Sequence, residues 1–413
     1  MAQNNAAGKG RLLRLAAACV TMFALGFIYG WSVFSTPIAE EFQWEPATMS
    51  FTFTMLMWVF CAGGFIGAKI CDHTSPRFTL IISAVSIFIA FCSCAYFANA
   101  DAPFVLYFTY GLFGGLGVGM AYTVTMGTAL AWFPDKAGTA SGILLLCYGV
   151  STMILSSVVA WLCSFMYWRA AFPLISGVMA AVIIAMAFVL RRPTDAEFAL
   201  LPKPAAAAAS NADMQKSKTT AQMVCTPAFW TYALWMIIMC TVSLGFTGNA
   251  NQFGLAAGAE PALAVALVGV FSVCNGLGRF VNGLIFDALG LFKTILIVAI
   301  AHGLSAVFII LGLVNGSVLI MGFALAFAGV SIGGTPVCGS GFMATAFGPK
   351  HYSQNLAVLN LSIIPAALVG PLYLSLSISS TGSYVLGLGI SAALTIVGAA
   401  CAFATNYFMK RAK

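Results

Sequence analysis

Charge is scarce in this chain, and acidic charge is scarcer than basic charge. Only 7% of the 413 residues are Asp, Glu, Lys or Arg, whereas 61% are hydrophobic. Soluble globular domains carry about 25% charged residues, so the composition excludes a soluble protein. The 11 acidic residues all fall between the long apolar stretches or at their ends. This placement argues against a membrane enzyme that works through paired carboxylates.

Cysteine and histidine show no metal or disulfide pattern. The 12 cysteines contain no C-x-x-C pair, and the three histidines, His73, His302 and His351, lie far apart. All cysteines but Cys225 belong to apolar stretches, where cysteine usually acts as a small hydrophobe. The sequence also lacks a P-loop and a nucleophile–His–acid arrangement. We therefore expect no metal, no cofactor and no enzymatic activity.

Apolar stretches of 18 or more residues recur along the whole chain, each long enough to cross a bilayer. They predict an all-α membrane protein with twelve transmembrane helices at residues 12–35, 47–70, 78–98, 103–131, 138–163, 170–190, 228–250, 262–286, 292–314, 316–345, 353–377 and 383–409.

Three stretches predict local features within these helices. The glycines of YGLFGGLGVG, residues 110–119, favour close helix packing in the fourth span. The polar GNANQF, residues 248–253, is expected to end the seventh span. The sequence around Pro336 is a candidate for a kinked or broken tenth span.

The chain divides into two similar halves. A polar segment, residues 191–227, separates an N-terminal six-helix half, residues 1–190, from a C-terminal half, residues 228–413. Asp72 and Asp287 are 215 residues apart in corresponding loops, and Lys136 and Lys350 are 214 apart in another pair. Two loops with nearly the same offset indicate a parallel repeat. Such repeats place a substrate site at mid-membrane, between the halves.

Basic residues gather on one side of the membrane. When loops are assigned to alternate sides of the membrane, 16 of the 18 basic residues fall on the same side. The positive-inside rule identifies that side as the cytoplasm. We therefore expect a protein of the cytoplasmic membrane with both termini in the cytoplasm. The basic residues on the cytoplasmic side are Lys9, Arg11, Arg14, Lys69, Arg77, Lys136, Arg191, Arg192, Lys203, Lys216, Lys218, Lys293, Lys350, Lys410, Arg411 and Lys413. The net charge of +7 therefore reflects membrane topology and does not indicate a nucleic-acid partner.

Arg279 is the exception, because it lies in the middle of the eighth apolar stretch. A guanidinium there costs from about 2.5 to more than 10 kcal/mol unless it faces a polar interior. Asn275, Arg279, Asn282 and Phe286 follow the spacing of one helical face, so two amides accompany the arginine. We expect Arg279 to bind the carboxylate of a small anion. A structural partner or a lipid headgroup is the alternative, and the lack of a mid-membrane acid weighs against it.

Several motifs resemble a known family. They are the repeated loop acids Asp72 and Asp287 with basic residues after them, WFPDKAGTASG, TPAFW, FDALGLFKT, FGPKHYSQN, and N-x-x-x-R from Asn275 to Arg279. In a twelve-span chain these are similar to the major facilitator superfamily and, within it, to the oxalate:formate antiporter family, which is allied to the monocarboxylate transporters.

The resemblance implies a gating role for the two loops. In the superfamily, the loop acid and a following basic residue hold the cytoplasmic side closed. Asp287 with Lys293 matches this pattern, whereas the first copy keeps Asp72 and Arg77 but has His73 and Ser75 at other motif positions. The first latch is therefore expected to be weaker, or sensitive to pH through His73. Solvated loop charges that only fix topology are the alternative, which stays open for Lys293.

The resemblance also implies a set of residues along the substrate pathway. The matching stretches place Tyr29, Trp31, Tyr122 and Tyr148 there, although a tyrosine in a membrane helix is commonly an interfacial anchor or packing residue. Oxalate-transporting members carry a lysine in the eleventh span. This chain has none there and has Asn360, Ser362 and Pro365 in that region, so we include Asn360 as a candidate contact.

One membrane cation matches one carboxylate. A dianion would keep an uncompensated charge in a site of low dielectric constant, so we expect a monocarboxylate. The predicted function is a secondary transporter of small organic anions, working as a single chain by alternating access. Exchange needs no membrane-embedded acid, and proton-coupled symport stays open. The alternative function is export of drugs or other hydrophobic compounds.

Overall fold

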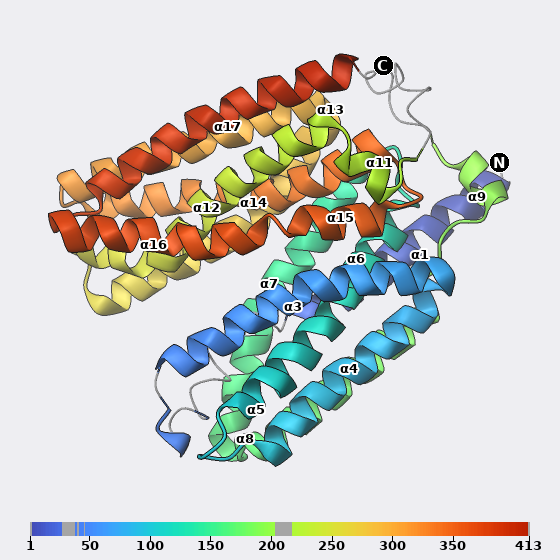
Figure 1. Cartoon of the computed structure of the whole chain (residues 1–413), viewed down its shortest axis with the longest axis horizontal. Helices are drawn as coiled ribbons and strands as arrows, with labels where there is room; N and C mark the ends of the chain where they lie inside the picture. The colour runs from blue at the N-terminus through green and yellow to red at the C-terminus, as the bar shows by residue number, and fades with distance from the viewer. Residues whose placement is uncertain (1, 27–37, 39–40, 45, 203–216, 412–413) are drawn as a thin grey trace. The chain divides into compact units, whose positions relative to one another are not determined.

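Figure 1 shows the computed structural model, which describes residues 2–26, 38, 41–44, 46–202 and 217–411. No β-strand occurs in these ranges. The elements are α1 (Ala2–Leu25), α3 (Pro46–His73), α4 (Pro76–Phe97), α5 (Phe104–Leu106), the π-helix η2 (Tyr107–Gly114), α6 (Gly115–Leu130), α7 (Ala137–Phe165), α8 (Trp168–Ala187), α9 (Asp195–Leu200), α11 (Thr220–Val224), α12 (Pro227–Ala256), α13 (Pro261–Val314), α14 (Val318–Phe347), α15 (Tyr352–Asn360), α16 (Ile363–Thr381) and α17 (Val385–Arg411).

Contacts between residues divide the chain into two compact units. Unit 1 comprises Met1–Asp135, Cys147–Lys203 and Tyr352–Val358, and unit 2 comprises Lys136–Leu146, Pro204–His351 and Leu359–Lys413. The first segment of α7 thus packs with the C-terminal helices, and most of α15 packs with the N-terminal helices. The half boundaries at residues 190 and 228 stay a prediction.

Unit 1 is built around α6, which glycines bring close to α3. A Cβ added at Gly119 would lie 2.1 Å from the carbonyl oxygen of Phe60, and one at Gly63 would lie 2.6 Å from that of Leu116. Neither distance leaves room for a side chain. The glycines of the fourth span therefore serve close packing, as expected, because small residues let helix backbones approach each other within a membrane.

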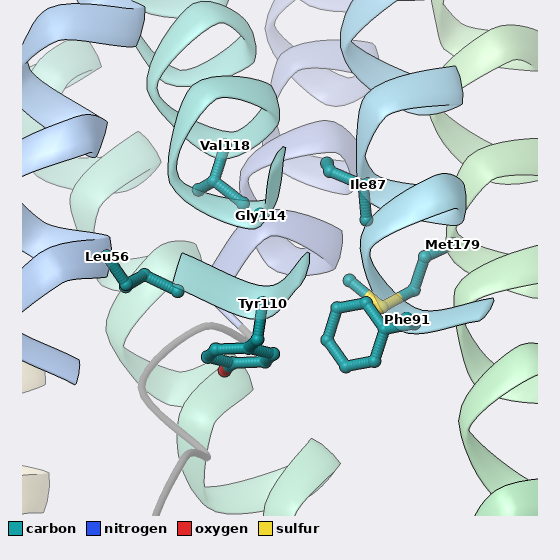
Figure 2. Close-up of a pocket in the computed structure, with 7 residues that line it drawn as sticks. All are labelled: Leu56, Ile87, Phe91, Tyr110, Gly114, Val118 and Met179. Carbon is teal, nitrogen blue, oxygen red and sulfur yellow. The ribbon is translucent and has the colours of Figure 1, made fainter. Parts of the chain in front are cut away.

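The π-helix η2 leads into α6 and borders a small apolar cavity (Figure 2). The cavity encloses about 10 Å³, room for about one water molecule, and is lined by Leu56, Ile87, Phe91, Tyr110, Gly114, Val118 and Met179. It is too small for an organic anion. The sequence did not predict the π-helix, because its i→i+5 hydrogen bonding leaves no recognisable repeat in a largely apolar stretch.

Unit 2 centres on α13 and α14, which also meet through glycines. A Cβ at Gly278 would lie 2.4 Å from the carbonyl oxygen of Val330, and one at Gly333 would lie 2.6 Å from the amide nitrogen of Arg279. Phe246, Phe253 and Leu325 belong to the buried apolar core nearby. This packing holds the segment around Arg279 against α14.

Large apolar side chains cover the outside of the helices. Leu319 is 86% exposed, Ile396 72% and Leu368 71%. Within the described ranges, nine helices are long and apolar enough to cross a membrane. Because α13 spans two predicted stretches, these nine contain ten of the twelve predicted spans. The first predicted span begins in α1 and continues beyond the described residues, and the fifth corresponds to α7.

The helix ends differ from the expectations in two places and agree in a third. GNANQF does not end a helix, because α12 continues to Ala256. The helix α14 runs without a break through Pro336, whereas a break falls between α15 and α16, just before Pro365. The expected break between the eighth and ninth spans is present within α13, at Gly290, whose φ of 77° is not helical. Only glycine adopts that angle readily.

The polar segment between the halves is partly helical where it is described. Thr194 and Glu197 form a capping box at the start of α9, and Thr219 and Gln222 form one at α11. Hydrogen bonds from the Arg191 guanidinium, with a further one from the Thr194 backbone, lower the pKa of Glu197 to about 2. Residues 203–216 lie outside the described part.

Candidate functional site

Arg279 is held against the first segment of α7. Its Nη1 donates to the main-chain carbonyl of Leu145, with 2.6 Å between the two atoms. Gly142 makes this approach possible, because a Cβ there would lie 2.6 Å from the carbonyl oxygen of Arg279. The guanidinium is therefore positioned by a backbone group, which contributes no negative charge.

The remaining edge of the guanidinium has no partner in the described chain. Ion pairs there join Arg11 with Asp135, Arg169 with Glu41, Arg191 with Glu197 and Arg192 with Asp72, and Arg279 is in none of them. Its Nε is buried without a hydrogen bond. With Nη1 occupied by Leu145, the Nε–Nη2 edge presents the two parallel donors that match a carboxylate.

The two predicted amides behave differently. Oδ1 of Asn275 is buried without a hydrogen-bond partner among the described residues. Asn282 is 4% exposed and donates to the carbonyls of Gly278, at 2.8 Å, and Val330, at 3.0 Å. Asn282 thus joins α13 to α14, while the carbonyl oxygen of Asn275 stays buried without a hydrogen bond.

Asp287 contacts the N-terminus of α7. Its carboxylate accepts from the backbone N–H groups of Gly138, at 2.8 Å, and Thr139, at 2.7 Å. These are among the first amides of the helix, which have no intrahelical acceptor, and the helix dipole favours negative charge there. Lys293, the basic residue of the same motif, is exposed and forms no ion pair in the described chain, and its gating role stays a prediction.

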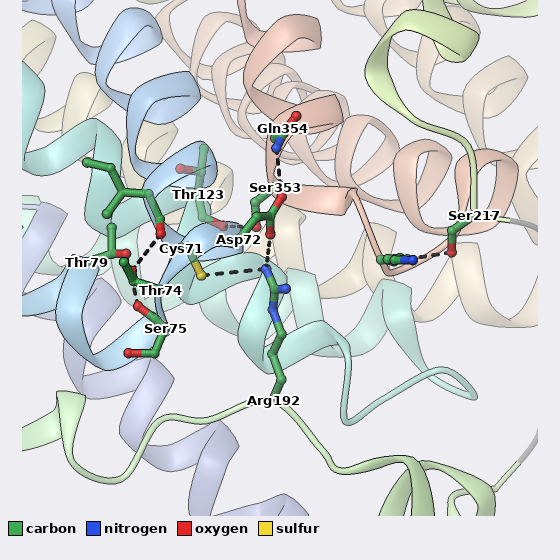
Figure 3. Close-up of polar contacts among 12 residues, drawn as sticks. Cys71, Asp72, Thr74, Ser75, Thr79, Thr123, Arg192, Ser217, Ser353 and Gln354 are labelled. Carbon is green, nitrogen blue, oxygen red and sulfur yellow. Dashed lines mark hydrogen bonds and ion pairs between the residues drawn. The ribbon is translucent and has the colours of Figure 1, made fainter.

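Asp72, the loop acid that corresponds to Asp287 in the first half of the sequence, lies in unit 1 (Figure 3). It accepts from Arg192 at 2.9 Å and from the side chain of Gln354, in the first turn of α15, at 2.7 Å. Arg77, the basic residue of the same motif, stacks on Phe188 with 3.7 Å from guanidinium carbon to ring centroid, and its gating role stays a prediction. Ser75, at the position of the expected turn glycine, caps α4 and accepts from the amide of Phe78 at 3.2 Å.

The predicted aromatic residues lie in unit 1 where they are described. Tyr122 and Tyr148 are buried, and their ring centroids are 5.4 Å apart. Tyr29 and Trp31 lie outside the described residues. Asn360, at the end of α15, is 7% exposed and belongs to unit 2.

His302 is fully buried between three helices of unit 2. Its Nδ1 lies 2.9 Å from the carbonyl of Val298 and 2.6 Å from Oγ of Ser331, and its Nε2 lies 2.9 Å from Oγ of Ser243. Because a carbonyl only accepts, Nδ1 carries a proton and Nε2 accepts from a hydroxyl. This arrangement makes His302 a packed, hydrogen-bonded residue of unit 2.

Sequence reasoning missed the partners of the charged residues, namely the Leu145 carbonyl, the Gly138 and Thr139 amides, Arg192 and Gln354. A main-chain acceptor leaves no trace in residue type. The spacing of Gly138 and Gly142, in the stretch AGTASG, was the available signal, because two small residues four apart predict a close helix approach.

Comparisons with known proteins agree with this fold. Residues 16–371 match the family profile of the Major Facilitator Superfamily. The chain is 26% identical to the oxalate:formate antiporter of Oxalobacter formigenes, over 79% of this chain and 76% of that protein. It is 23% identical to the MFS-type transporter YhjX of Escherichia coli K12, over 85% and 84%.

Solved structures give the same result. The chain superimposes on the proton:xylose symporter XylE with a TM-score of 0.70 and 13% identity, covering 96% of this chain and 95% of that one. The predicted resemblance and the all-α membrane fold are thus confirmed. The chain belongs to the Major Facilitator Superfamily and is a secondary transporter.

Proposed function

We propose that the chain carries small monocarboxylates across the cytoplasmic membrane, and that Arg279 binds the carboxylate. The supporting observation is the guanidinium edge described above: Nε is buried without a hydrogen bond, and no carboxylate of the described chain neutralises Arg279. A desolvated cation of this kind is costly unless a counter-ion binds to it. A planar, bidentate carboxylate fits the Nε–Nη2 edge.

The cation count favours a monoanion over a dianion. One relative is named for oxalate and formate, a dianion and a monoanion. No lysine or arginine occurs between His351 and Tyr384 in this chain, so Arg279 has no second cation from α15 or α16. A second carboxylate near Arg279 would lose its hydration without gaining a counter-charge, which is energetically costly.

For the transport cycle, we propose anion exchange by alternating access. Asp72 and Asp287 are the proposed gating acids, because each contacts the first turn of a helix from the opposite half of the sequence. Arg77 and Lys293 keep at most a secondary role in this scheme.

The orientation in the membrane is a separate proposal. Basic residues on one side of the spans favour cytoplasmic termini, which reporter fusions at either end would test.

Counterflow in proteoliposomes tests the substrate class. Full-length protein is reconstituted with an unlabelled acid inside, and labelled formate, acetate, lactate, pyruvate and oxalate are offered outside. We expect saturable exchange of monocarboxylates and little exchange of oxalate. Arg279→Gln is expected to abolish exchange of every acid, because the amide keeps hydrogen bonding but removes the charge.

Arg411→Gln is the matched control, since it removes a cation at the end of α17, where the guanidinium only stacks on Tyr407. It should exchange at the wild-type rate. Full exchange by a monodisperse Arg279→Gln variant would refute the proposal. Uptake of hydrophobic cations with no exchange of any acid would support the exporter instead.

A further inference from the structure

Three arginines of unit 1 gather on two aromatic rings, at the point where the apolar stretch of α1 begins. The arginine cluster consists of Arg11 and Arg14 from α1 and Arg191 from the segment after α8. The guanidinium carbon of Arg11 lies 4.4 Å from the ring centroid of Phe133, in the turn after α6. Those of Arg14 and Arg191 lie 5.6 Å and 5.2 Å from the ring centroid of Trp132. Both rings are buried, so the cluster rests on a packed surface.

The neighbouring acids leave one cation of the arginine cluster without a counter-charge. Arg11 pairs with Asp135, and Arg191 pairs with Glu197. Within the described ranges Arg14 forms no ion pair, and its Nε is buried without a hydrogen bond. Nε of Arg11 is also buried and unbonded there. Three guanidinium groups against two carboxylates leave a single positive charge in excess.

The two unmet donors are close enough to share one ligand. Arg11 and Arg14 are three residues apart on α1, so their side chains lie on the same helical face, with about 5–6 Å between the Cβ atoms. A guanidinium nitrogen only donates, and a buried charged donor without an acceptor is costly. A ligand that satisfies both needs several acceptor oxygens and one negative charge.

We propose that the arginine cluster binds the phosphodiester of an anionic phospholipid such as phosphatidylglycerol. The phosphodiester carries a single negative charge, which balances the excess positive charge of the cluster. Its oxygens accept from Arg14 and Arg11, because guanidinium groups match the geometry of phosphate. The inference concerns residues of unit 1 alone and is independent of the proposed function, which depends on Arg279.

The position of the cluster favours a lipid over a phosphate from solution. Leu12 and Leu13, beside the two arginines of α1, are 64% and 54% exposed, so acyl chains can contact the same turn of the helix. A free phosphate monoester carries about 1.5 to 2 negative charges near pH 7, more than the cluster balances. The proposed orientation also places this end of α1 in the cytoplasmic leaflet, which contains anionic lipids.

The charge of the cluster favours an anionic headgroup over a zwitterionic one. The ammonium group of phosphatidylcholine would bring a second positive charge beside Arg14, where like charges repel. The uncharged glycerol of phosphatidylglycerol avoids this repulsion. We therefore expect selection by headgroup as well as by the phosphodiester.

Native mass spectrometry of the full-length protein in detergent tests the proposal, because it resolves single bound lipids by mass. Dioleoyl phosphatidylglycerol and dioleoyl phosphatidylcholine are titrated separately, and inorganic phosphate is then added as a competitor. We expect the Kd for phosphatidylglycerol to be at least about 10-fold lower than that for phosphatidylcholine, with no displacement by inorganic phosphate. Equal affinity for the two lipids, or displacement by inorganic phosphate, would overturn the inference.

Variants of Arg14 test the assigned residue. Arg14→Gln should raise the Kd for phosphatidylglycerol about 10- to 100-fold, the size expected for lost charge-assisted hydrogen bonds. Arg14→Lys keeps the charge but loses the planar fork, and should raise it about threefold or more. Arg411→Gln is the matched control, since Arg411 also stacks on an aromatic ring, that of Tyr407, but is exposed. Its Kd should stay within about twofold of wild type.

The variants also separate a defined site from general attraction to basic residues. General attraction would be weakened equally by Arg14→Gln and Arg411→Gln, and that result would refute the site. Thermal unfolding without added lipid establishes that each variant is folded. If Arg14→Gln does not fold, Arg14→Lys decides the question, and wild-type affinity in that variant would refute the role of Arg14.

Discussion

Nη1 of Arg279 lies 2.6 Å from the carbonyl oxygen of Leu145, so the membrane-embedded cation is bonded to the backbone of α7. This bond takes one end of the guanidinium and leaves the Nε–Nη2 edge for a ligand. It also fixes the direction in which that edge faces, since a planar group bonded at one end loses most of its rotational freedom.

Gly142 should be required for this geometry. In Gly142→Ala the new Cβ would meet the carbonyl oxygen of Arg279 at 2.6 Å, a contact with backbone that only a helix shift relieves. We expect a loss of about 1–3 kcal/mol in stability. The exchange rate should fall about 10- to 100-fold, because displacements near 1 Å have effects of that size.

Thermal unfolding in detergent and counterflow measure the two effects. Gly269→Ala is the matched control, since it lies on α13 with no atom within 4 Å of the added Cβ. Wild-type exchange by Gly142→Ala would show that the approach of α7 to Arg279 is dispensable.

Asp287 should stabilise the start of α7. Asp287→Ala removes the acceptor of the Gly138 and Thr139 amides, which are left without a partner. Loss of a capping side chain costs about 0.5–2 kcal/mol. Hydrogen exchange measured by mass spectrometry should therefore rise in the peptide covering residues 136–146, and Asp101→Ala, at an exposed loop acid, should leave it unchanged. An unchanged rate in Asp287→Ala would contradict the capping role.

The helices and the central arginine were predictable because both follow directly from the types of residue in the sequence. Long apolar stretches can only form helices in lipid, and a lone Arg279 among them is conspicuous. The partners of the charged residues were not predictable. Asp72 pairs with Arg192, 120 residues away, and Asp287 bonds to backbone amides, so neither partner follows from local spacing. The hydrogen-bonding difference between Asn275 and Asn282 likewise depends on the rotation of α13 against α14.

Asp72 should couple energetically to Arg192 and not to Arg77. In double-mutant cycles with Asp72→Asn, we expect a coupling of about 0.3–1 kcal/mol for Arg192→Gln, the range of partly exposed ion pairs. The cycle with Arg77→Gln should give a coupling near zero, because Arg77 stacks on Phe188. Thermal unfolding of the purified variants supplies the four stabilities. A larger coupling for Arg77 would restore the pairing expected from the sequence motif.

His302 should affect stability and leave the pH dependence of transport unchanged. His302→Leu removes the partner of the Ser243 and Ser331 hydroxyls, both of which are buried. Each unmet hydroxyl costs about 1–3 kcal/mol, but serine can bond to the carbonyl one turn earlier, so we expect a total of about 1–3 kcal/mol.

The measurements are thermal unfolding and the exchange rate between pH 5.5 and 8, with His351→Leu, outside this hydrogen-bonded group, as the control. In the wild type the Val298 carbonyl accepts from Nδ1 and a hydroxyl donates to Nε2, so the neutral ring is satisfied without taking up a proton. A folded His302→Leu variant whose pH profile shifts relative to wild type would show that this imidazole carries protons. Such a shift would favour proton-coupled symport over simple anion exchange.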